Sequence, residues 1–234
     1  MAAHQISHAD DIFYGNSDFA AGIGYWGRDG FKITPPFRHT WTNVTTANTT
    51  GAMTATTFAA AGAVTFDSNV SGGVVTFDVP RNATFNTTTG VNLTAKTLSL
   101  AGTDLYGVAM SEHIIGPNGS LSPGVGVKAF KTLTSGSVSS SISAAVSIGF
   151  GTKLGLPFAI TGKRDVLAFY TDDTLEISST FVGAVTTSPA TVSTGDVRGT
   201  VDPTTAPNGT RDFTIHFVAL DVDTKTNLYG VTQA

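Results

Sequence analysis

Apolar and polar residues alternate along much of this chain, most clearly between Ser137 and Ile148. The even-numbered positions there are mostly apolar, for example Val138 and Ile142, whereas the odd-numbered positions are mostly serine. A repeat of two places these sets on opposite faces of a pleated strand, while a helix would need apolar residues three and four apart. The pattern therefore predicts one strand over residues 137–148.

A hairpin is predicted at residues 62–79, because Gly72 and Gly73 supply the positive φ angles that a tight turn needs. Pro80 follows, and we expect it to end the pairing because it has no N–H to donate. Residues 166–170 are almost all apolar, which is typical of a strand buried on both faces. Further strands are expected at 106–115, 175–185, 197–201 and 213–220.

The number and kind of these elements predict the fold class. Roughly nine to eleven strands, with no helix longer than a turn or two, predict an all-β fold, either an antiparallel β-sandwich or a jelly-roll-like domain. Residues 1–40 lack this pattern and predict an irregular N-terminal arm. Residues 41–234 predict the β-rich domain, with a subdivision near 154–160 left open.

The N-terminal arm is rich in aromatic residues and glycine. One interpretation is an irregular segment that packs on its own domain. The other is an extended arm that docks on a neighbouring subunit, because aromatic anchors dominate the energetics of many interfaces. The candidate partner-binding residues are Phe13, Tyr14, Phe19, Tyr25, Trp26 and Phe31.

Composition narrows the classes of partner. The net charge is −4 and only 13% of residues are charged, so we expect no nucleic-acid partner, which would require a clustered basic face. The chain has no cysteine and therefore no disulfide or thiolate chemistry, which suits folding in a reducing cytoplasm. No secretory signal and no apolar run of about 18 residues is visible, so no membrane partner is expected.

Residues that carry chemistry are sparse. His113 and His216 are each isolated within strands, which favours surface or hydrogen-bonded roles over catalysis. Asp172, Asp173 and Glu176 cluster at a turn, but turn carboxylates are mostly solvated and this spacing matches no calcium loop. We therefore expect no catalytic residue, no metal and no cofactor.

Three sets of turn and strand motifs carry a family resemblance. The first is Pro80-Arg-Asn-Ala-Thr84, Gly102-Thr-Asp-Leu-Tyr-Gly-Val-Ala-Met-Ser-Glu112 and Gly116-Pro-Asn118. The second is Lys128-Ala-Phe-Lys-Thr-Leu-Thr-Ser135 with Leu154-Gly-Leu-Pro157. The third is Thr194-Gly-Asp-Val-Arg-Gly-Thr200 with Pro207-Asn-Gly-Thr-Arg211. In these motifs the chain resembles structural proteins of tailed bacteriophages, especially phages of aquatic bacteria, and residues 1–60 lie outside the resemblance.

The resemblance implies a non-enzymatic virion component without active-site residues. More specifically, it implies a capsid cement or decoration protein that stabilises the head by binding capsomer junctions. The expected partners are further copies of the chain, as a homotrimer, and the major capsid protein. The expected location is the virion, after assembly in the host bacterial cytoplasm. A tail-tube, adaptor or fibre component is the alternative within this group. A carbohydrate-binding or hydrolytic β-sandwich is the alternative from another class, with Asp172 and Asp173 as the residues to test.

Overall fold

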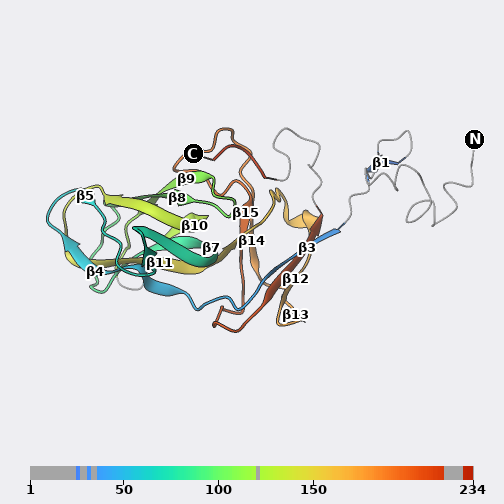
Figure 1. Cartoon of the computed structure of the whole chain (residues 1–234), viewed down its shortest axis with the longest axis horizontal. Helices are drawn as coiled ribbons and strands as arrows, with labels where there is room; N and C mark the ends of the chain where they lie inside the picture. The colour runs from blue at the N-terminus through green and yellow to red at the C-terminus, as the bar shows by residue number, and fades with distance from the viewer. Residues whose placement is uncertain (1–24, 27–30, 33–35, 120–121, 219–228, 234) are drawn as a thin grey trace, which may run out of the picture.

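The computed structural model describes residues 25–26, 31–32, 36–119, 122–218 and 229–233. These residues form a ten-stranded sheet, a four-stranded sheet and a separate pair of strands, all antiparallel (Figure 1). The larger sheet contains β4 (Asn48–Phe58), β5 (Gly62–Ala63), β6 (Val70–Ser71), β7 (Val74–Thr87), β8 (Thr97–Thr103), β9 (Ala109–Ile115), β10 (Gly124–Val138), β11 (Ile142–Gly155), β14 (Thr180–Gly183) and β15 (Gly199–Asp202). The smaller sheet contains β3 (Pro36–Trp41), β12 (Val166–Thr171), β13 (Thr174–Leu175) and β16 (Phe213–Val218). The separate pair is β1 (Tyr25–Trp26) and β2 (Phe31–Lys32).

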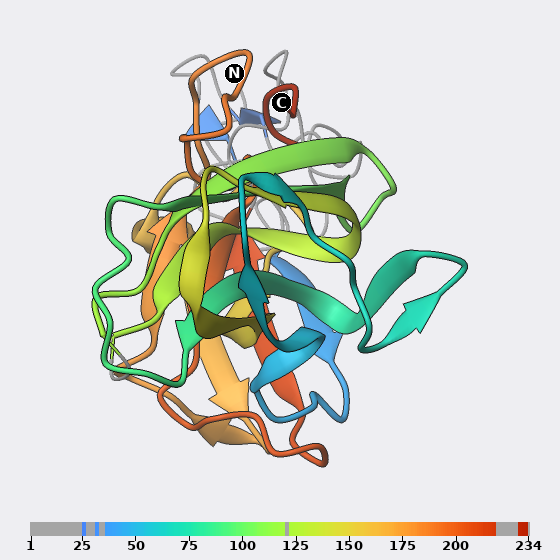
Figure 2. The same ribbon diagram turned by 90° about the vertical axis from the view of Figure 1, so that its left-hand side faces the viewer.

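The ten-stranded sheet curls into a half-barrel (Figure 2). Its main path runs β14-β15-β11-β7-β10-β8-β9, with β4 paired to β11, β5 to β10 and β6 to β7. Register shifts interrupt the pairing among the long strands β7, β10 and β11, and such irregularities allow a strand to bend. The curl encloses the larger core, which includes Phe77, Phe85, Phe130, Leu133 and Ile148.

The four-stranded sheet has the order β13-β12-β16-β3. In β16 the alternation of apolar and polar residues in the sequence matches the burial of its side chains. In β16, Phe213, Ile215 and Phe217 are buried, whereas Thr214 and His216 between them are half-buried. The buried face packs against the ends of β11 and β15 and forms a second core. Among the members of this core are Trp41, Leu154, Leu156, Phe169 and Val201.

A fully buried arginine of β7 joins β11 and the segment between β3 and β4. The Arg81 Nε and Nη2 atoms donate to the Gly151 carbonyl at 2.9 and 2.6 Å, and Nη1 donates to the Thr45 carbonyl at 3.0 Å. Nη1 also lies 3.5 Å from the Asp78 carboxylate, and the guanidinium carbon lies 5.0 Å from the centre of the Phe150 ring. These contacts satisfy a buried charge that would otherwise be costly.

The prediction of an all-β antiparallel fold is confirmed. Its two layers are a curled half-barrel and a small sheet that packs on one end of it. In the described residues the helical content includes the single turn η2 (Lys163–Asp165) ahead of β12. None of the helices in this part of the chain has the length and apolar character needed to cross a membrane.

The prediction of one strand over residues 137–148 is wrong in one respect. β10 ends at Val138 and β11 begins at Ile142, so a tight turn divides the segment. The alternation survives this turn because Val138 and Ile142 both point into the core, with relative exposures of 2% and 1%. The serines between them form the turn, and the pattern therefore resembles an unbroken strand.

The hairpin at Gly72 and Gly73 is present, with φ angles of 59° and 82°. Its first arm is β6, however, while residues 62–63 pair with β10 instead. Pro80 does not end β7, which continues to Thr87. The pairing between β7 and β10 is irregular around Pro80, and this interruption accommodates a residue without an N–H.

The prediction that residues 166–170 are buried on both faces is also wrong, because Leu167 is 57% exposed. Neither layer covers this part of the β12 surface.

The predicted strand at 175–185 is divided into the end of β13 and the separate strand β14. Residues 36–40 of the predicted arm belong to β3, which pairs with β16. The division into an arm and a β-rich domain stays a prediction.

Candidate functional site

Three large apolar side chains lie on the surface beside β12. Ile177 is 84% exposed, Leu167 57% and Leu175 52%. They border a hollow of about 270 Å³ whose deeper wall includes Phe169 and Ile215 from the second core. We call this feature the β12–β14 hollow. A contiguous apolar patch, unlike single exposed residues, is typical of an interaction surface.

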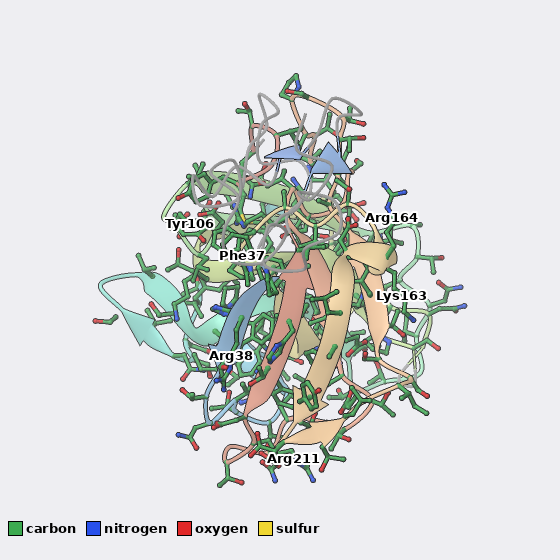
Figure 3. All side chains as sticks on the ribbon, turned by 90° about the vertical axis from the view of Figure 1, so that its right-hand side faces the viewer. Phe37, Arg38, Tyr106, Lys163, Arg164 and Arg211 are labelled. Carbon is green, nitrogen blue, oxygen red and sulfur yellow. The ribbon has the colours of Figure 1, made fainter. Side chains whose placement is uncertain are left out.

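Opposite charges lie at the two ends of β12. Lys163 and Arg164 precede the strand, and Asp172 and Asp173 follow it, all four with exposed side chains. Figure 3 shows Lys163 and Arg164 near one end of the small sheet and Arg211 near the other. Arg211 Nε lies 3.7 Å from the Asp172 carboxylate, so the positive charge of Arg211 partly compensates the negative charge at this end. The β12–β14 hollow is therefore bordered by a basic end and an acidic end.

Asp172 and Asp173 serve the turn between β12 and β13. Their φ angles are 47° and 62°, and they separate the paired residues Thr171 and Thr174. Two consecutive positive φ angles are characteristic of the type I′ hairpin turn, which tolerates aspartate. The Asp172 carboxylate also accepts the Asp212 N–H at 3.0 Å. These contacts give Asp172 a structural role in the turn.

Glu176, the third carboxylate of this cluster, is held by hydrogen bonds. It accepts the Thr171 hydroxyl at 2.7 Å and the N–H groups of Thr204 and Thr205 at 2.9 and 3.0 Å. Burial acts to raise the pKa of Glu176, but these hydrogen bonds outweigh burial and lower the pKa below its ordinary value. Within the described ranges no group of three or more metal-binding side chains converges, at this turn or elsewhere.

A cluster of buried charged residues lies between β9, β10 and the loop before β15. Glu112, Lys128 and Asp196 are 2%, 0% and 4% exposed. Glu112 Oε1 accepts the N–H groups of Val127 and Lys128 at 2.5 and 3.3 Å. Asp196 Oδ2 accepts the N–H of Ala129 at 2.9 Å. The two carboxylates thus occupy the edge of β10 where carbonyl groups of a neighbouring strand would otherwise lie.

Burial controls the ionisation of this cluster. It raises the pKa of Glu112 from 4.5 to about 7, against the hydrogen bonds from β10 and the charge of Lys128, which lower it. Burial likewise raises the pKa of Asp196 and lowers the pKa of Lys128. Because the carboxylates are enclosed and bonded to backbone amides, we assign the cluster a structural role.

The histidines in the described part of the chain make contacts that suit structural roles. The His216 ring lies 5.7 Å from the Tyr170 ring, and the His39 ring lies 4.6 Å from Trp41 in an edge-on arrangement. Burial lowers the pKa of His39. The backbone N–H of His113 donates to the Val192 carbonyl at 3.0 Å.

The predicted partner-binding aromatics are not tested by the structure. Phe13, Tyr14 and Phe19 lie outside the described residues. Tyr25, Trp26 and Phe31 belong to β1 and β2, whose backbone pairing is described but whose side chains are not. Their role in binding a neighbouring subunit stays a prediction.

Sequence reasoning did not identify the buried charged cluster, although a signal was present. Glu112 stands between Met110 and Ile114, two buried residues on the same face of β9. A charged residue on an otherwise apolar face predicts a buried, partnered charge. Its partners Lys128 and Asp196 lie far along the chain, and sequence periodicity does not bring them together.

The comparisons with known proteins do not identify a relative. The chain matches no family model, no curated protein and no solved structure.

Proposed function

We propose that this chain is a non-enzymatic structural component of a tailed-phage virion, a capsid cement or decoration protein that associates with further copies of itself. The resemblance of the motifs between residues 80 and 211 supports the class of protein. The β12–β14 hollow supports self-association, and its exposed residues Leu167, Leu175 and Ile177 are the observation on which the proposal rests.

Apolar burial supplies the driving force for this association. Full burial of one large aliphatic side chain contributes about 1.5–3 kcal/mol, so three such residues contribute several kcal/mol. Part of that gain is offset by the loss of translational and rotational freedom. The balance favours an assembly that forms at high local concentration, as on the surface of a shell.

The charges at the ends of β12 favour a second copy as the occupant of the hollow. When copies pack head to tail, Lys163 and Arg164 of one copy approach Asp172 and Asp173 of the next. Such complementarity aligns the partners and increases the association rate. A heterologous contact of this kind closes into a ring when its rotation permits, and a trimer is such a ring.

The mass of the purified protein in solution tests self-association. Sedimentation equilibrium is expected to give a trimer for the native chain and a monomer for Ile177→Lys, which places a charge in the apolar contact. Val91→Lys is the matched control, because Val91 is also exposed, at 43%, and lies away from the hollow. A native monomer, or an Ile177→Lys trimer, contradicts self-association through this surface.

The cement role needs a separate test on virus particles. Particles that lack the protein are expected to be less resistant to heat and to low salt, and so to lose infectivity at a lower temperature, or at a higher salt concentration during dilution, than complete particles. Equal resistance contradicts the cement role.

Cryo-electron microscopy of the virion then distinguishes the alternatives, since a cement protein covers the head, whereas a tail-tube, adaptor or fibre protein occurs at the tail.

A further inference from the structure

A second cavity, remote in sequence from the β12–β14 hollow, lies where three segments meet. The turn between β8 and β9 contributes Asp104, Tyr106 and Val108, the segment before β15 contributes Arg198, and the C-terminal segment contributes Tyr229 and Gln233. Its volume is about 470 Å³. Small-molecule sites commonly measure about 300–1,000 Å³ and combine apolar walls with a few oriented polar groups.

The polar part of this cavity is a buried ion pair. Arg198 Nη2 lies 2.8 Å from Asp104 Oδ2, and the two side chains are 4% and 0% exposed. Asp104 Oδ1 also accepts the N–H groups of Tyr106 and Val108 at 2.8 and 2.9 Å, which holds the β8–β9 turn in place. The charge of Arg198 is thus matched within the protein, and the cavity has no excess charge that would call for an ionic ligand.

Two polar atoms at this ion pair have no hydrogen-bond partner among the described residues. One is the donor Arg198 Nε, and the other is the acceptor Gln233 Oε1. The orientation of the Gln233 amide is set by Asp104, because Gln233 Nε2 donates to Asp104 Oδ2 at 3.3 Å and a carboxylate only accepts. A hydroxyl group both accepts and donates, so it is the ligand group whose chemistry matches this unpaired donor and this unpaired acceptor.

The wall of the cavity is aromatic. The rings of Tyr106 and Tyr229 lie 5.0 Å apart at 83°, and the side chains are 45% and 55% exposed. The Tyr106 hydroxyl donates to the Pro157 carbonyl at 2.6 Å, and the Arg198 guanidinium lies 5.2 Å from the Tyr106 ring, so this ring is fixed. The negative face of an aromatic ring attracts the weakly positive C–H groups of a pyranose.

We propose that this cavity binds a neutral carbohydrate, with a pyranose ring against Tyr229 and Tyr106 and one of its hydroxyls between Arg198 and Gln233. That hydroxyl accepts from Arg198 Nε and donates to Gln233 Oε1. A site built to bond a hydroxyl strongly rejects a ligand that lacks it, because the buried polar atoms are then left unpaired. An acidic sugar is disfavoured, because its carboxylate faces Asp104 and the Gln233 oxygen.

The test uses the full chain on an array of neutral and acidic glycans, followed by calorimetric titration of the best neutral ligand. Tyr229→Ala removes the stacking surface, and Gln233→Leu removes the acceptor together with the hydrogen bond to Asp104. Each is expected to weaken binding by about tenfold or more, as the loss of one hydrogen bond or ring contact implies. Tyr170→Ala is the matched control, since Tyr170 lies on β12 and does not line the cavity.

The outcomes separate clearly. The proposal is supported if the chain binds a neutral glycan, both cavity variants weaken this binding, and Tyr170→Ala leaves it unchanged. No binding at millimolar concentration, binding of acidic glycans alone, or binding that Tyr229→Ala and Gln233→Leu leave unchanged overturns it. Unchanged thermal unfolding midpoints of the two variants exclude a loss of fold as the cause.

Discussion

Arg81 donates two hydrogen bonds to the single carbonyl of Gly151, at 2.9 and 2.6 Å, and so joins β7 to β11 through a side chain as well as through the ladder. The planar guanidinium is what makes this double contact geometrically feasible. Because Arg81 is fully buried, none of this interaction is shared with solvent. Gly151 lies within the register shift that interrupts the β7–β11 pairing between Phe150 and Leu154.

Arg81→Lys is expected to lower the free energy of unfolding by about 3 kcal/mol, because a lysine keeps the charge but loses the forked hydrogen bonds. Urea denaturation of the native chain and the variant measures the change. Arg164→Lys is the control, since the Arg164 side chain is 84% exposed and its replacement is expected to cost less than about 0.5 kcal/mol. Equal effects of the two substitutions would contradict the importance of the buried fork.

The elevated pKa of Glu112 predicts that the native fold loses stability as the pH rises. The pKa is 4.5 in the unfolded chain and about 7 in the folded chain, so between these values the folded state binds more protons. The contribution of Glu112 to stability therefore falls as the pH rises through this window and is level outside it. A shift of this size corresponds to about 3 kcal/mol.

Urea denaturation across this pH window measures the effect, with Glu112→Gln as the variant that cannot ionise. The glutamine oxygen still accepts the Val127 N–H, so we expect a flatter pH profile than that of the native chain. Glu176→Gln is the control, because the pKa of Glu176 is lowered and its titration lies at more acidic pH. A native profile as flat as that of Glu112→Gln would show that Glu112 titrates normally.

Gly102 is predicted to tolerate no side chain. A Cβ atom at this position would lie 1.9 Å from the Thr132 carbonyl oxygen, where β8 meets β10. Gly102→Ala is expected to lower stability by about 3 kcal/mol, since the backbone itself must move. At Gly62 a Cβ meets nothing within 4 Å, so Gly62→Ala serves as the control and is expected to change stability by less than about 0.5 kcal/mol. Thermal unfolding followed by circular dichroism distinguishes the two; similar midpoints would refute the steric argument.

The strands were predictable because burial repeats every second residue. In β16 the sequence alternation and the observed burial agree at every described position. The turn between Val138 and Ile142 was missed for the same reason, since its length preserved the alternation. Where a strand ends depends on its neighbours, and Pro80 shows that an irregular ladder accommodates a residue that normally stops pairing.

The candidate sites were less predictable, because exposure and convergence are properties of the whole fold. An apolar run such as residues 166–170 predicts a strand but does not reveal that Leu167 lacks cover. The sugar-binding cavity combines residues as distant as Asp104 and Gln233, which no periodicity connects. By contrast, the turn role of Asp172 was suggested by its position in a polar cluster.

The carboxylates of Glu112 and Asp196 along β10 have a consequence for newly made chains. An unoccupied strand edge recruits strands from other molecules and leads to aggregation. At Val127, Lys128 and Ala129 the backbone N–H donors are already engaged by side chains of the same molecule, so these three donors are not available to a foreign strand. This part of β10 is thereby protected against pairing with a newly made neighbouring chain before the fold is complete.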